Sequence, residues 1–462
     1  MKRLAMGLLC AWLAGCATAP DYHAPAMPLP AHYTEAQDVA RQRIPANWWA
    51  VYQDRDLDAL IRRIDVSTPT LGKSLALLRD ARAQRDAARA AYFPTIGANV
   101  SASSSHVSAN VVGRSLAGQT TPDRLIGFGA SWEPDLFGRI GNNVDAADSR
   151  VQASADDVAA VRLSLQAEVA VDYFGIRSLD RESALLRQTV EAYSSVLELV
   201  TNRYRGGIAA ESDVAQAQAQ RDSTRAQLAD LTLARTQLQH ALATLLGEPA
   251  STFSVARQDS YDTQLPVAPS AVPSELLQRR PDIAAAERRV AAANSLIGVA
   301  RAAFFPSLML NLSGGVESSG LAGLLTAPSR FWAVGPALAA TVFDGGKRRA
   351  GVDSARAQFD ASAADYRETV LKAVQDVEDN YAAIRLLKEE AGSQASAVTA
   401  SRLALAQATD RYQKGASAYL DVNVVEATTL ANERTLEEIR RRQLSASVSL
   451  FRALGGGWQP AD

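Results

Sequence analysis

Two long proline-free stretches constrain the fold of this chain more than any other feature of its sequence. No proline occurs in residues 135–248 or in residues 337–459. Because a proline inside a helix costs about 3 kcal/mol, its absence permits very long helices. We expect residues 139–205 to form one helix about 100 Å long and residues 347–413 to form a second. Periodic patterns beyond about 25 residues indicate a coiled coil or a helical repeat, so the chain is predicted to be mainly α-helical. A plain coiled-coil rod is the simplest alternative.

The chain is also an internal duplication. Residues 89–95 (RAAYFPT) recur 212 residues later as residues 301–307 (RAAFFPS). The Arg-Tyr pair and the glycine of residues 203–207 recur 208 residues later, in residues 411–415. The segment that separates the Phe-Pro motif from the next shared motif is about six residues longer in the first copy, and such length changes concentrate in loops. The sequence therefore predicts two copies of one unit, with an exposed loop in the first copy.

Between these motifs the hydrophobic pattern changes to a period of two, in four segments. Polar and apolar residues alternate in residues 95–102, and in the other three segments the apolar residues fall on one face. Those residues are Ile126, Phe128, Ala130 and Trp132 in the second segment, Leu308, Leu310 and Leu312 in the third, and Trp332, Val334, Leu338 and Val342 in the fourth. Period-two segments of about ten residues are typical of transmembrane β-strands, whose two faces contact lipid and a lumen. Soluble β-hairpins packed on the helices fit the same pattern.

Four strands cannot close a membrane sheet by themselves. A sheet in lipid leaves no open edges, and the smallest closed bacterial barrel has about eight strands. If the strands cross a membrane, the chain must therefore oligomerise. Two chains would supply about eight strands and three about twelve, and the number of strands per chain does not determine whether a dimer or a trimer forms.

The first residues of the chain form an export signal. Lys2 and Arg3 are followed by an apolar stretch that ends at Cys16. The pattern resembles the bacterial lipoprotein signal, which implies that residues 1–15 are removed and that Cys16 is lipidated. Ala17 follows, where the inner-membrane retention signal of such proteins has Asp, and this points to the outer membrane. An ordinary cleaved signal with a chance cysteine is the alternative.

Several motifs are shared with one known family. They are residues 47–49 (NWW), residues 276–283 (LLQRRPDI), Ala286-Glu287, Ile297-Gly298 and the Phe-Phe-Pro-Ser run of residues 304–307. With these motifs the chain resembles the outer membrane factors of tripartite efflux pumps, in particular their TolC-like, NodT-type lipoprotein branch. The resemblance implies a mainly α chain with a transmembrane β part, in which two tandem repeats give four β-strands and long coiled-coil helices. It also implies a trimer with a 12-stranded β-barrel and a 12-helix periplasmic α-barrel.

The repeat and the resemblance together predict a division of the chain. It runs as a signal peptide at 1–15, a lipidated N-terminal segment of the equatorial region at 16–55, a first repeat at 56–250, a linker at 251–272, a second repeat at 273–455 and a tail at 456–462. Each repeat is expected to hold a helix, a β-hairpin and a long helical hairpin. The β-hairpins are expected at about 95–136 and 307–343, and the helical hairpins at about 139–246 and 347–454.

The turns between the paired long helices carry the candidate functional residues. Cations in a last turn, a glycine after it and an acid at the next helix start are what helix ends favour, so turn formation alone explains these residues. By the resemblance, the tips also close the periplasmic mouth and contact an adaptor protein. The gate candidates are Asp421, Arg411, Tyr412 and Lys414, of which the last three are expected to bridge to a neighbouring helix. The adaptor-contact candidates are Arg203, Tyr204, Gly207, Asp213 and Gly415.

The second tip departs from the family pattern. Where the family usually carries Asp-Val-Leu-Asp-Ala, residues 421–425 read DVNVV, so only the first acid is kept. The resemblance therefore implies one gate acid per chain, and three copies of Asp421 would form an acidic ring. A plain N-cap is the alternative role for this residue.

The sequence predicts a channel rather than an enzyme. A formal charge of −2 excludes a generally basic nucleic-acid binder. No phosphate loop, zinc motif or Gly-X-Ser-X-Gly elbow occurs, so no cofactor, metal site or catalytic group is expected.

The resemblance implies a homotrimeric exit duct in the outer membrane, anchored through Cys16 and extending into the periplasm. It would carry small molecules or drugs from an inner-membrane transporter, of the resistance-nodulation-division class, and a periplasmic adaptor. The alternatives are an exit duct for type I protein secretion and a non-conducting periplasmic coiled-coil scaffold lipoprotein.

Overall fold

The computed structural model of the chain describes residues 18–36, 44–113, 115–269 and 272–459. The predicted signal and the lipidation candidate Cys16 lie outside the described residues. The chain forms two compact units, and each takes segments from both repeats. The first unit holds the described residues of the ranges 18–26, 78–154 and 286–366, and the second those of the ranges 27–77, 155–285 and 367–459.

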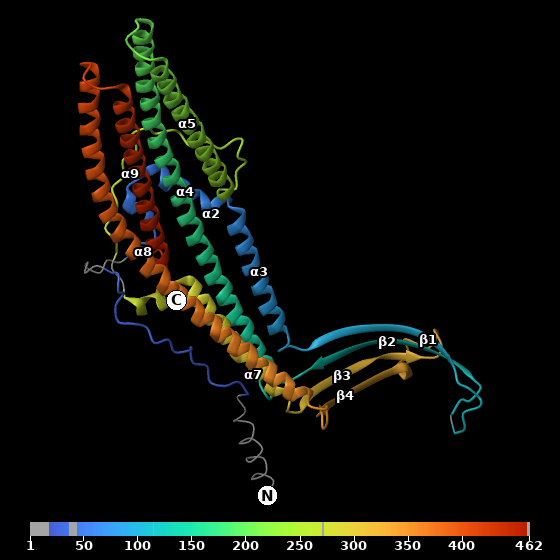
Figure 1. Cartoon of the computed structure of the whole chain (residues 1–462). Coiled ribbons are helices and arrows are strands. Elements are labelled where there is room, and N and C mark those ends of the chain that lie inside the picture. The colour runs from blue at the N-terminus through green and yellow to red at the C-terminus, as the bar shows by residue number, and fades with distance from the viewer. Residues whose placement is uncertain (1–17, 37–43, 114, 270–271, 460–462) are drawn as a thin grey trace. The chain divides into compact units, whose positions relative to one another are not determined.

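The long helices repeat with the spacing that the sequence shows (Figure 1). Helix α4 spans Arg139–Arg205 and α8 spans Lys347–Gln413, and both contain 67 residues. Helices α5 (Glu211–Leu245) and α9 (Tyr419–Ala453) both contain 35 residues. The two long helices that the proline-free stretches predict are therefore confirmed, with the predicted bounds.

Shorter elements precede each long hairpin. Helices α3 (Pro69–Ala90) and α7 (Pro281–Ala302) contain 22 residues each. Both begin at a proline, which suits a first helical turn because the N–H that proline lacks would have no partner there. The remaining elements are η1 (Trp48–Tyr52), α2 (Arg55–Ser67), η2 (Pro273–Glu275), α6 (Leu276–Arg279) and η3 (Ala327–Ser329).

The first unit contains an antiparallel sheet of four strands (Figure 1). Its strands are β1 (Thr95–His106), β2 (Thr120–Trp132), β3 (Ser307–Ser318) and β4 (Arg330–Ala339), and they lie in the order β1-β2-β3-β4. The four predicted strands are therefore present. In the described part of the chain, β1 and β4 are the edge strands, and each has one edge with no neighbouring strand.

The last strand is shorter than the sequence pattern predicts. It ends at Ala339, so Val342 is not part of it. The chain instead forms the turn that starts α8. There the Asp344 carboxylate accepts hydrogen bonds from the backbone N of Gly346 at 3.0 Å and of Arg348 at 3.2 Å. Gly346 has a φ of 95°, which a residue with a side chain rarely adopts. The turn that starts α8 therefore follows directly on the residues that the period of two assigned to a strand.

The register places most of the large apolar residues of the four strands on one face. Ile96 pairs with Ala130, Ala130 with Leu312, and Leu312 with Val334, so one row crosses the whole sheet. The adjacent row, on the opposite face, consists of Gly97, Gly129, Ser313 and Ala333. Because successive side chains of a strand point to opposite faces, one face of the sheet is apolar and the other carries small and polar residues.

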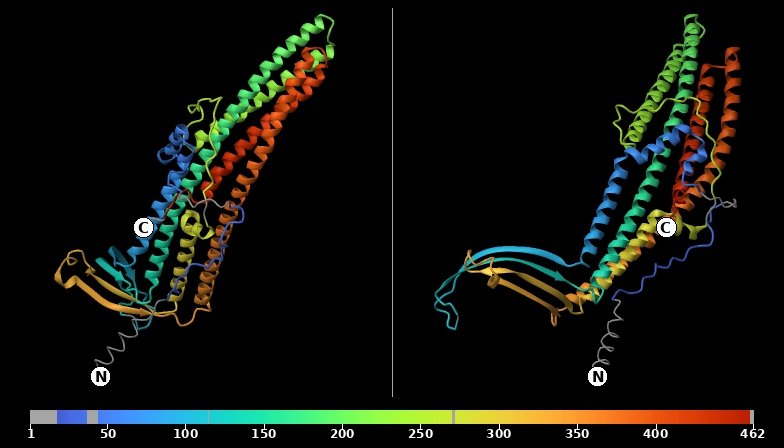
Figure 2. Two further views of the ribbon diagram at one scale, coloured as in Figure 1. Left: turned by 90° about the vertical axis from the view of Figure 1, so that its left-hand side faces the viewer. Right: turned by 180° about the vertical axis from the view of Figure 1, so that it is seen from behind.

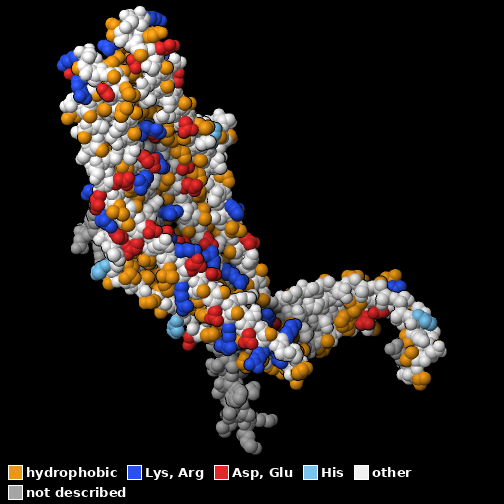
Figure 3. All heavy atoms as spheres, in the orientation of Figure 1, with side chains coloured by type: hydrophobic (Ala, Val, Ile, Leu, Met, Phe, Trp, Pro, Cys, Tyr) orange, Lys and Arg blue, Asp and Glu red, His pale blue; other side chains and the backbone are white. Residues whose placement is uncertain are grey.

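In the second unit the long helices pack as two antiparallel pairs. Figure 2 shows α5 beside α4 and α9 beside α8 in both views. Leu186 on α4, Leu231 on α5 and Leu430 on α9 form one buried cluster, and Leu387 on α8 packs with Ile439 on α9 in another. On the face seen in Figure 3, charged side chains of both signs are scattered over these helices. Among the described residues, no helix combines the length and the apolar character needed to cross a membrane.

A buried ionic cluster, which we call the Asp180 cluster, fixes the segment after α5. It consists of Arg177 and Asp180 on α4 and Arg235 on α5. Asp180 is fully buried, and its carboxylate accepts hydrogen bonds from Arg235 Nε at 2.6 Å and from the backbone N of Gln258 at 3.2 Å. Arg177 Nη1 lies 3.5 Å from the same carboxylate. Both arginines also donate to backbone carbonyls of residues 255–256, at 2.8 and 2.6 Å.

Candidate functional site

Both helical hairpins turn in the same way at their tips. At the end of α4, the backbone N of Gly207 donates to the carbonyl of Tyr204, and that of Ile208 to the carbonyl of Arg203, both at 2.9 Å. Gly207 has a φ of 71°, and together these features make a Schellman motif, which ends a helix cleanly. The same two bonds recur at the end of α8, where Gly415 has a φ of 75°. The predicted turn role of both glycines is therefore confirmed.

The two tips pack against each other through a buried cluster, which we call the tip cluster. Its members come from all four helices and are Val200 on α4, Ala217 on α5, Ala408 and Tyr412 on α8, and Tyr419 and Val422 on α9. The Arg203 guanidinium lies 4.6 Å from the centre of the Tyr412 ring. The Tyr419 ring lies 5.7 Å from the same ring. Tyr412 therefore connects α8 both to α4 and to α9 within one chain.

The cationic gate candidates lie in other surroundings. Lys414 follows directly on α8, and its Nζ lies 2.7 Å from Oδ2 of Asp410 in the last turn of α8, so its charge is paired with its own hairpin arm and not with a neighbouring helix. Arg411 is exposed and has no ion pair in the described part of the chain. The bridge that α8 makes to α4 comes from the side of α4, through Arg203.

The acids at the two helix starts differ. The Asp213 carboxylate accepts a hydrogen bond from the backbone N of Ala210 at 3.3 Å, so it reaches back to close the first turn of α5. In α9 the N-cap position is Ala418, with no side-chain cap. Asp421 is exposed in the first turn, and its carboxylate has no hydrogen bond or ion pair among the described residues. Asp421 therefore does not cap α9 through its side chain.

The tips also expose apolar surface that sequence reasoning missed. Ile208 is 80% exposed beside Gly207, and the neighbouring candidate Tyr204 is 43% exposed. On α9, Leu420 and Val424 are exposed as well. Large exposed apolar side chains gathered at one place are typical of contact surfaces. A signal existed in the sequence, because Ile208 follows directly on a glycine turn where polar residues are usual.

Glu426 is a second feature that sequence reasoning missed. Burial alone raises the pKa of this carboxyl group from 4.5 to about 7, and no charged group contributes to the shift. The Glu426 Oε2 atom and the Asn423 Oδ1 atom are both buried without a hydrogen-bond partner. These residues lie three positions apart on α9 and therefore on the same side of the helix. Because an ionised carboxylate and an amide oxygen only accept hydrogen bonds, a proton on Glu426 supplies the missing donor.

Two tyrosines interact electrostatically with Glu426. Tyr193 on α4 accepts a hydrogen bond from Gln220 on α5 at 3.2 Å, and burial raises its pKa to about 12. Burial also raises the pKa of Tyr419, and the Glu426 charge adds to both shifts. Both phenols stay neutral at physiological pH, so Glu426 is the one of these three groups that changes charge near neutral pH. In the described ranges, no group of three or more His, Cys, Asp or Glu side chains is placed to hold a metal ion.

The sheet of the first unit is the other candidate site. Its apolar face leaves large side chains in contact with solvent, and Ile96 and Trp332 are 73% and 77% exposed. Its second face presents small and polar residues such as Gly129 and Ser313. Because an apolar face suits lipid, a polar face suits water and open edges require further strands, the geometry fits one part of a membrane barrel shared by several chains.

Known proteins share both the sequence and the fold. The model of the family described as outer membrane efflux protein matches residues 60–248 and 272–456. The cation efflux system protein CusC of Escherichia coli is 30% identical over 451 residues, which cover 97% of each chain. Outer membrane protein OprJ of Pseudomonas aeruginosa is 32% identical over 470 residues, which cover 99% of this chain and 97% of OprJ. The crystal structure of the open state of the Neisseria gonorrhoeae MtrE outer membrane channel has a TM-score of 0.85 and 29% identity, over 96% of this chain and 98% of MtrE.

Proposed function

The chain belongs to the outer membrane efflux protein family, and from this premise we propose how its tips and its N-terminus act. As a member it is the outer membrane channel of a tripartite efflux pump. It forms a trimer with a 12-stranded β-barrel and a 12-helix α-barrel that extends into the periplasm. The observation that carries this function is the four-stranded sheet, with one apolar face, one polar face and two open edges. The resemblance to the outer membrane factors of tripartite efflux pumps is therefore confirmed.

We propose that the chain acts as a passive duct that is closed at its tips. Three copies of Asp421 would form an acidic ring at the periplasmic mouth. In support, the Asp421 carboxylate is exposed and has no partner within the described part of the chain. The stack of Arg203 on Tyr412 would hold α4 and α8 together in the closed state. Opening would require these contacts between the helix pairs to rearrange.

We propose that a periplasmic adaptor docks on the exposed tip residues, and that Ile208 and Tyr204 contribute apolar contacts. A photo-reactive residue in place of Ile208 should cross-link the adaptor in cells. The same residue in place of Leu371, an exposed position on α8 remote in sequence from the tip, is the control and should give no such product. Equal cross-linking from both positions would contradict docking at the tips.

We propose that the trimer is anchored by acyl chains on Cys16. The lipoprotein-like signal supports this, and several acyl chains bind a membrane firmly because each buried CH₂ contributes about 0.8 kcal/mol. Labelled palmitate should enter the wild-type chain and not the Cys16→Ser variant. The variant should keep some protein in the membrane, because the barrel inserts independently. Failure of the label to enter the wild type would refute the lipid anchor.

We further propose an inner-membrane transporter of the resistance-nodulation-division class as the source of energy, and small molecules as the cargo. The relatives are named for cargoes as different as cations and toluene, so family membership alone does not select one. Expression of the chain with the transporter and adaptor encoded beside it should restore export to cells that lack their own outer membrane channel. A trimer that assembles in the outer membrane and restores no export would contradict the proposal.

A further inference from the structure

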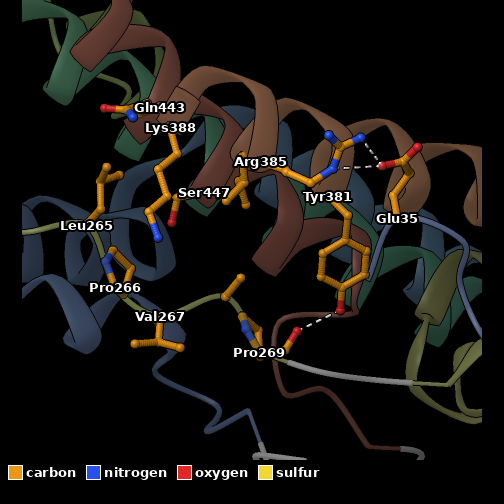
Figure 4. A pocket seen from close by; sticks show the side chains of 12 residues that line it. Glu35, Leu265, Pro266, Val267, Pro269, Tyr381, Arg385, Lys388, Gln443 and Ser447 are labelled. Atoms are coloured by element: carbon orange, nitrogen blue, oxygen red, sulfur yellow. Dashed lines mark hydrogen bonds and ion pairs between the residues drawn. The ribbon is translucent and has the colours of Figure 1, made fainter. Parts of the chain in front are cut away.

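The second unit holds a cavity of about 310 Å³ between α8, α9 and the segment that precedes η2, here called the α8 cavity (Figure 4). Leu265, Pro266 and Val267 form one wall and Ile384 forms part of another, so the lining is mostly apolar. Lys388 extends from α8 toward the segment 265–267 (Figure 4). The volume lies at the lower end of the range of small-molecule sites, about 300–1,000 Å³.

One charge in this cavity has no partner. Arg385 donates to Glu35 Oε2 from Nη2 at 2.5 Å and from Nε at 3.2 Å, so its charge is neutralised. Tyr381 OH donates to the carbonyl of Pro269 at 2.6 Å. Lys388, in contrast, forms no ion pair or hydrogen bond through its side chain among the described residues. The cavity therefore offers apolar walls and one uncompensated ammonium group.

The internal duplication allows the α8 cavity to be compared with the equivalent place in the first repeat. The α8 residues Tyr381 and Arg385 lie 208 positions after Tyr173 and Arg177, so the two copies share these side chains. At the next equivalent place, however, the first copy has the acid of the Asp180 cluster and the second copy has Lys388. In the first copy a carboxylate thus lies against arginines and away from water. In the second copy the equivalent residue is an exposed cation, and the one acid that lines the cavity, Glu35, is paired with Arg385, so no described carboxylate pairs with Lys388.

We propose that the α8 cavity binds an amphiphilic anion, a carboxylate on a compact aromatic or aliphatic body. The carboxylate would lie against the Lys388 ammonium, and the body would rest on the wall formed by residues 265–267. The ligand would supply to the second repeat the negative charge that Asp180 supplies to the first. The site lies on helices of the second unit and involves neither the tips nor the sheet, so binding can be measured whether or not the trimer conducts.

Calorimetric titration of the trimer in nanodiscs of zwitterionic lipid tests this proposal. The probe is 2-naphthoate, and 2-naphthylmethanol is its neutral counterpart. Lys388→Met keeps the aliphatic stem and should weaken 2-naphthoate binding by about tenfold or more, because a charge-assisted hydrogen bond is lost. The affinity for 2-naphthylmethanol should change little. Lys372→Met, on the same helix and outside the cavity, is the matched control and should bind 2-naphthoate as the wild type does.

A second variant locates the site. Val267→Trp fills the cavity and should abolish saturable binding of both probes while the trimer still assembles, as judged by size-exclusion chromatography. If Val267→Trp still binds 2-naphthoate, the probe binds elsewhere. If Lys388→Met binds 2-naphthoate as the wild type does, the ammonium selects no anion. If the wild-type trimer binds neither probe, the cavity is closed in the assembly, as it would be by a neighbouring subunit. Each of these three results overturns the proposal.

Discussion

Positions 180 and 388 are equivalent in the two repeats and lie on helices of equal length, but their side chains have opposite charges and different surroundings. Around Asp180 the first repeat buries an acid between arginines and ties down the segment after α5 with their remaining donors. Around Lys388 the second repeat leaves a cavity, and the lysine side chain has no partner among the residues that the structure describes. The two repeats therefore share one backbone fold, and a difference in a single polar side chain determines whether the chain fills the site itself or leaves a cavity there.

The tips repeat this contrast. Both hairpins end in the same Schellman motif, but Asp213 bonds back to its own helix start whereas Asp421 is exposed. Glu426, which titrates near neutrality, stands where the first repeat has Gln218. We therefore expect the tip of the second repeat to change its charge and its contacts, and the tip of the first repeat to keep its structure. Four predictions probe this difference.

The largest expected effect comes from Asp180. Asp180→Asn keeps the size of the side chain but leaves Arg235 buried without a counter-charge among the described residues, while Arg177 keeps only its ion pair with Asp56. Breaking a buried ion pair in this way costs about 3–5 kcal/mol of unfolding free energy. Lys388→Gln, at the equivalent position, should change stability by less than about 0.5 kcal/mol because the lysine is exposed and unpaired. Urea denaturation followed by circular dichroism measures both, and similar losses from the two variants would refute the contrast.

Glu426 should make the tip sensitive to pH. Its pKa is raised to about 7 in the packed tip and returns toward 4.5 when the tip loosens, so the packed tip binds the proton more tightly. This stabilisation of the packed tip is fully present below pH 4.5 and is lost as the pH rises through 7. For each subunit, the equilibrium between the packed and the loosened tip changes by at most about tenfold per pH unit. Channel openings in planar bilayers should therefore become more frequent between pH 5 and 8.

Glu426→Gln is the test of this pH dependence, since it places the residue of the first repeat in the second. It keeps a hydrogen-bond donor at all pH values and should flatten the profile toward infrequent opening. Gln218→Glu, at the exposed equivalent position, should leave the profile of the wild type unchanged. A Glu426→Gln channel with an unaltered pH profile would show that another group is responsible.

A smaller effect is expected at the Arg203–Tyr412 stack. Arg203→Ala removes a cation–π contact worth about 0.5–2 kcal/mol. Hydrogen exchange in the last turns of α4 and α8 should accelerate several-fold, because the two helices lose their connection. Arg411→Ala, at the equivalent position of the second repeat, removes an exposed side chain and should leave exchange nearly unchanged. Equal acceleration in both variants would contradict the role of the stack.

The smallest effect should separate the two tip acids. Asp213→Ala removes the hydrogen bond that the Asp213 carboxylate accepts from the backbone N of Ala210. This loss should cost about 0.5–1 kcal/mol of local stability at the start of α5. Asp421→Ala should cost less at the start of α9, because only its interaction with the helix dipole is lost. Hydrogen exchange of the first-turn amides reports both. The reverse order would mean that Asp421 caps its helix after all.

The backbone of this protein could be predicted from its sequence, because periodicity and proline placement act locally. The proline-free stretches allowed the length of α4 and α8, the glycine turns marked their C-terminal ends, and the four strands followed from the period of two. The end of β4 could not be predicted in this way. Asp344 begins the cap of α8 there, and capping outweighed a pattern that would have extended the strand past Ala339.

The side-chain environments could be predicted less well, because they depend on contacts between distant parts of the chain. Asp180 meets Arg235 only after α4 and α5 pair, so nothing in the neighbouring sequence marks it as buried. Glu426 looks like any polar residue of a helix surface until packing removes it from water. Comparing the two repeats position by position would have drawn attention to both, since each differs in charge from its counterpart.

Single-channel recording of the purified trimer in planar bilayers tests most directly whether this protein is a duct closed at its tips by Asp421. The wild type should show small, cation-selective conductance, because an acidic ring admits cations preferentially. Asp421→Ala should raise the conductance and reduce the preference for K⁺ over Cl⁻. A trimer that passes no ions in either form, or a variant with the conductance and selectivity of the wild type, would contradict the account.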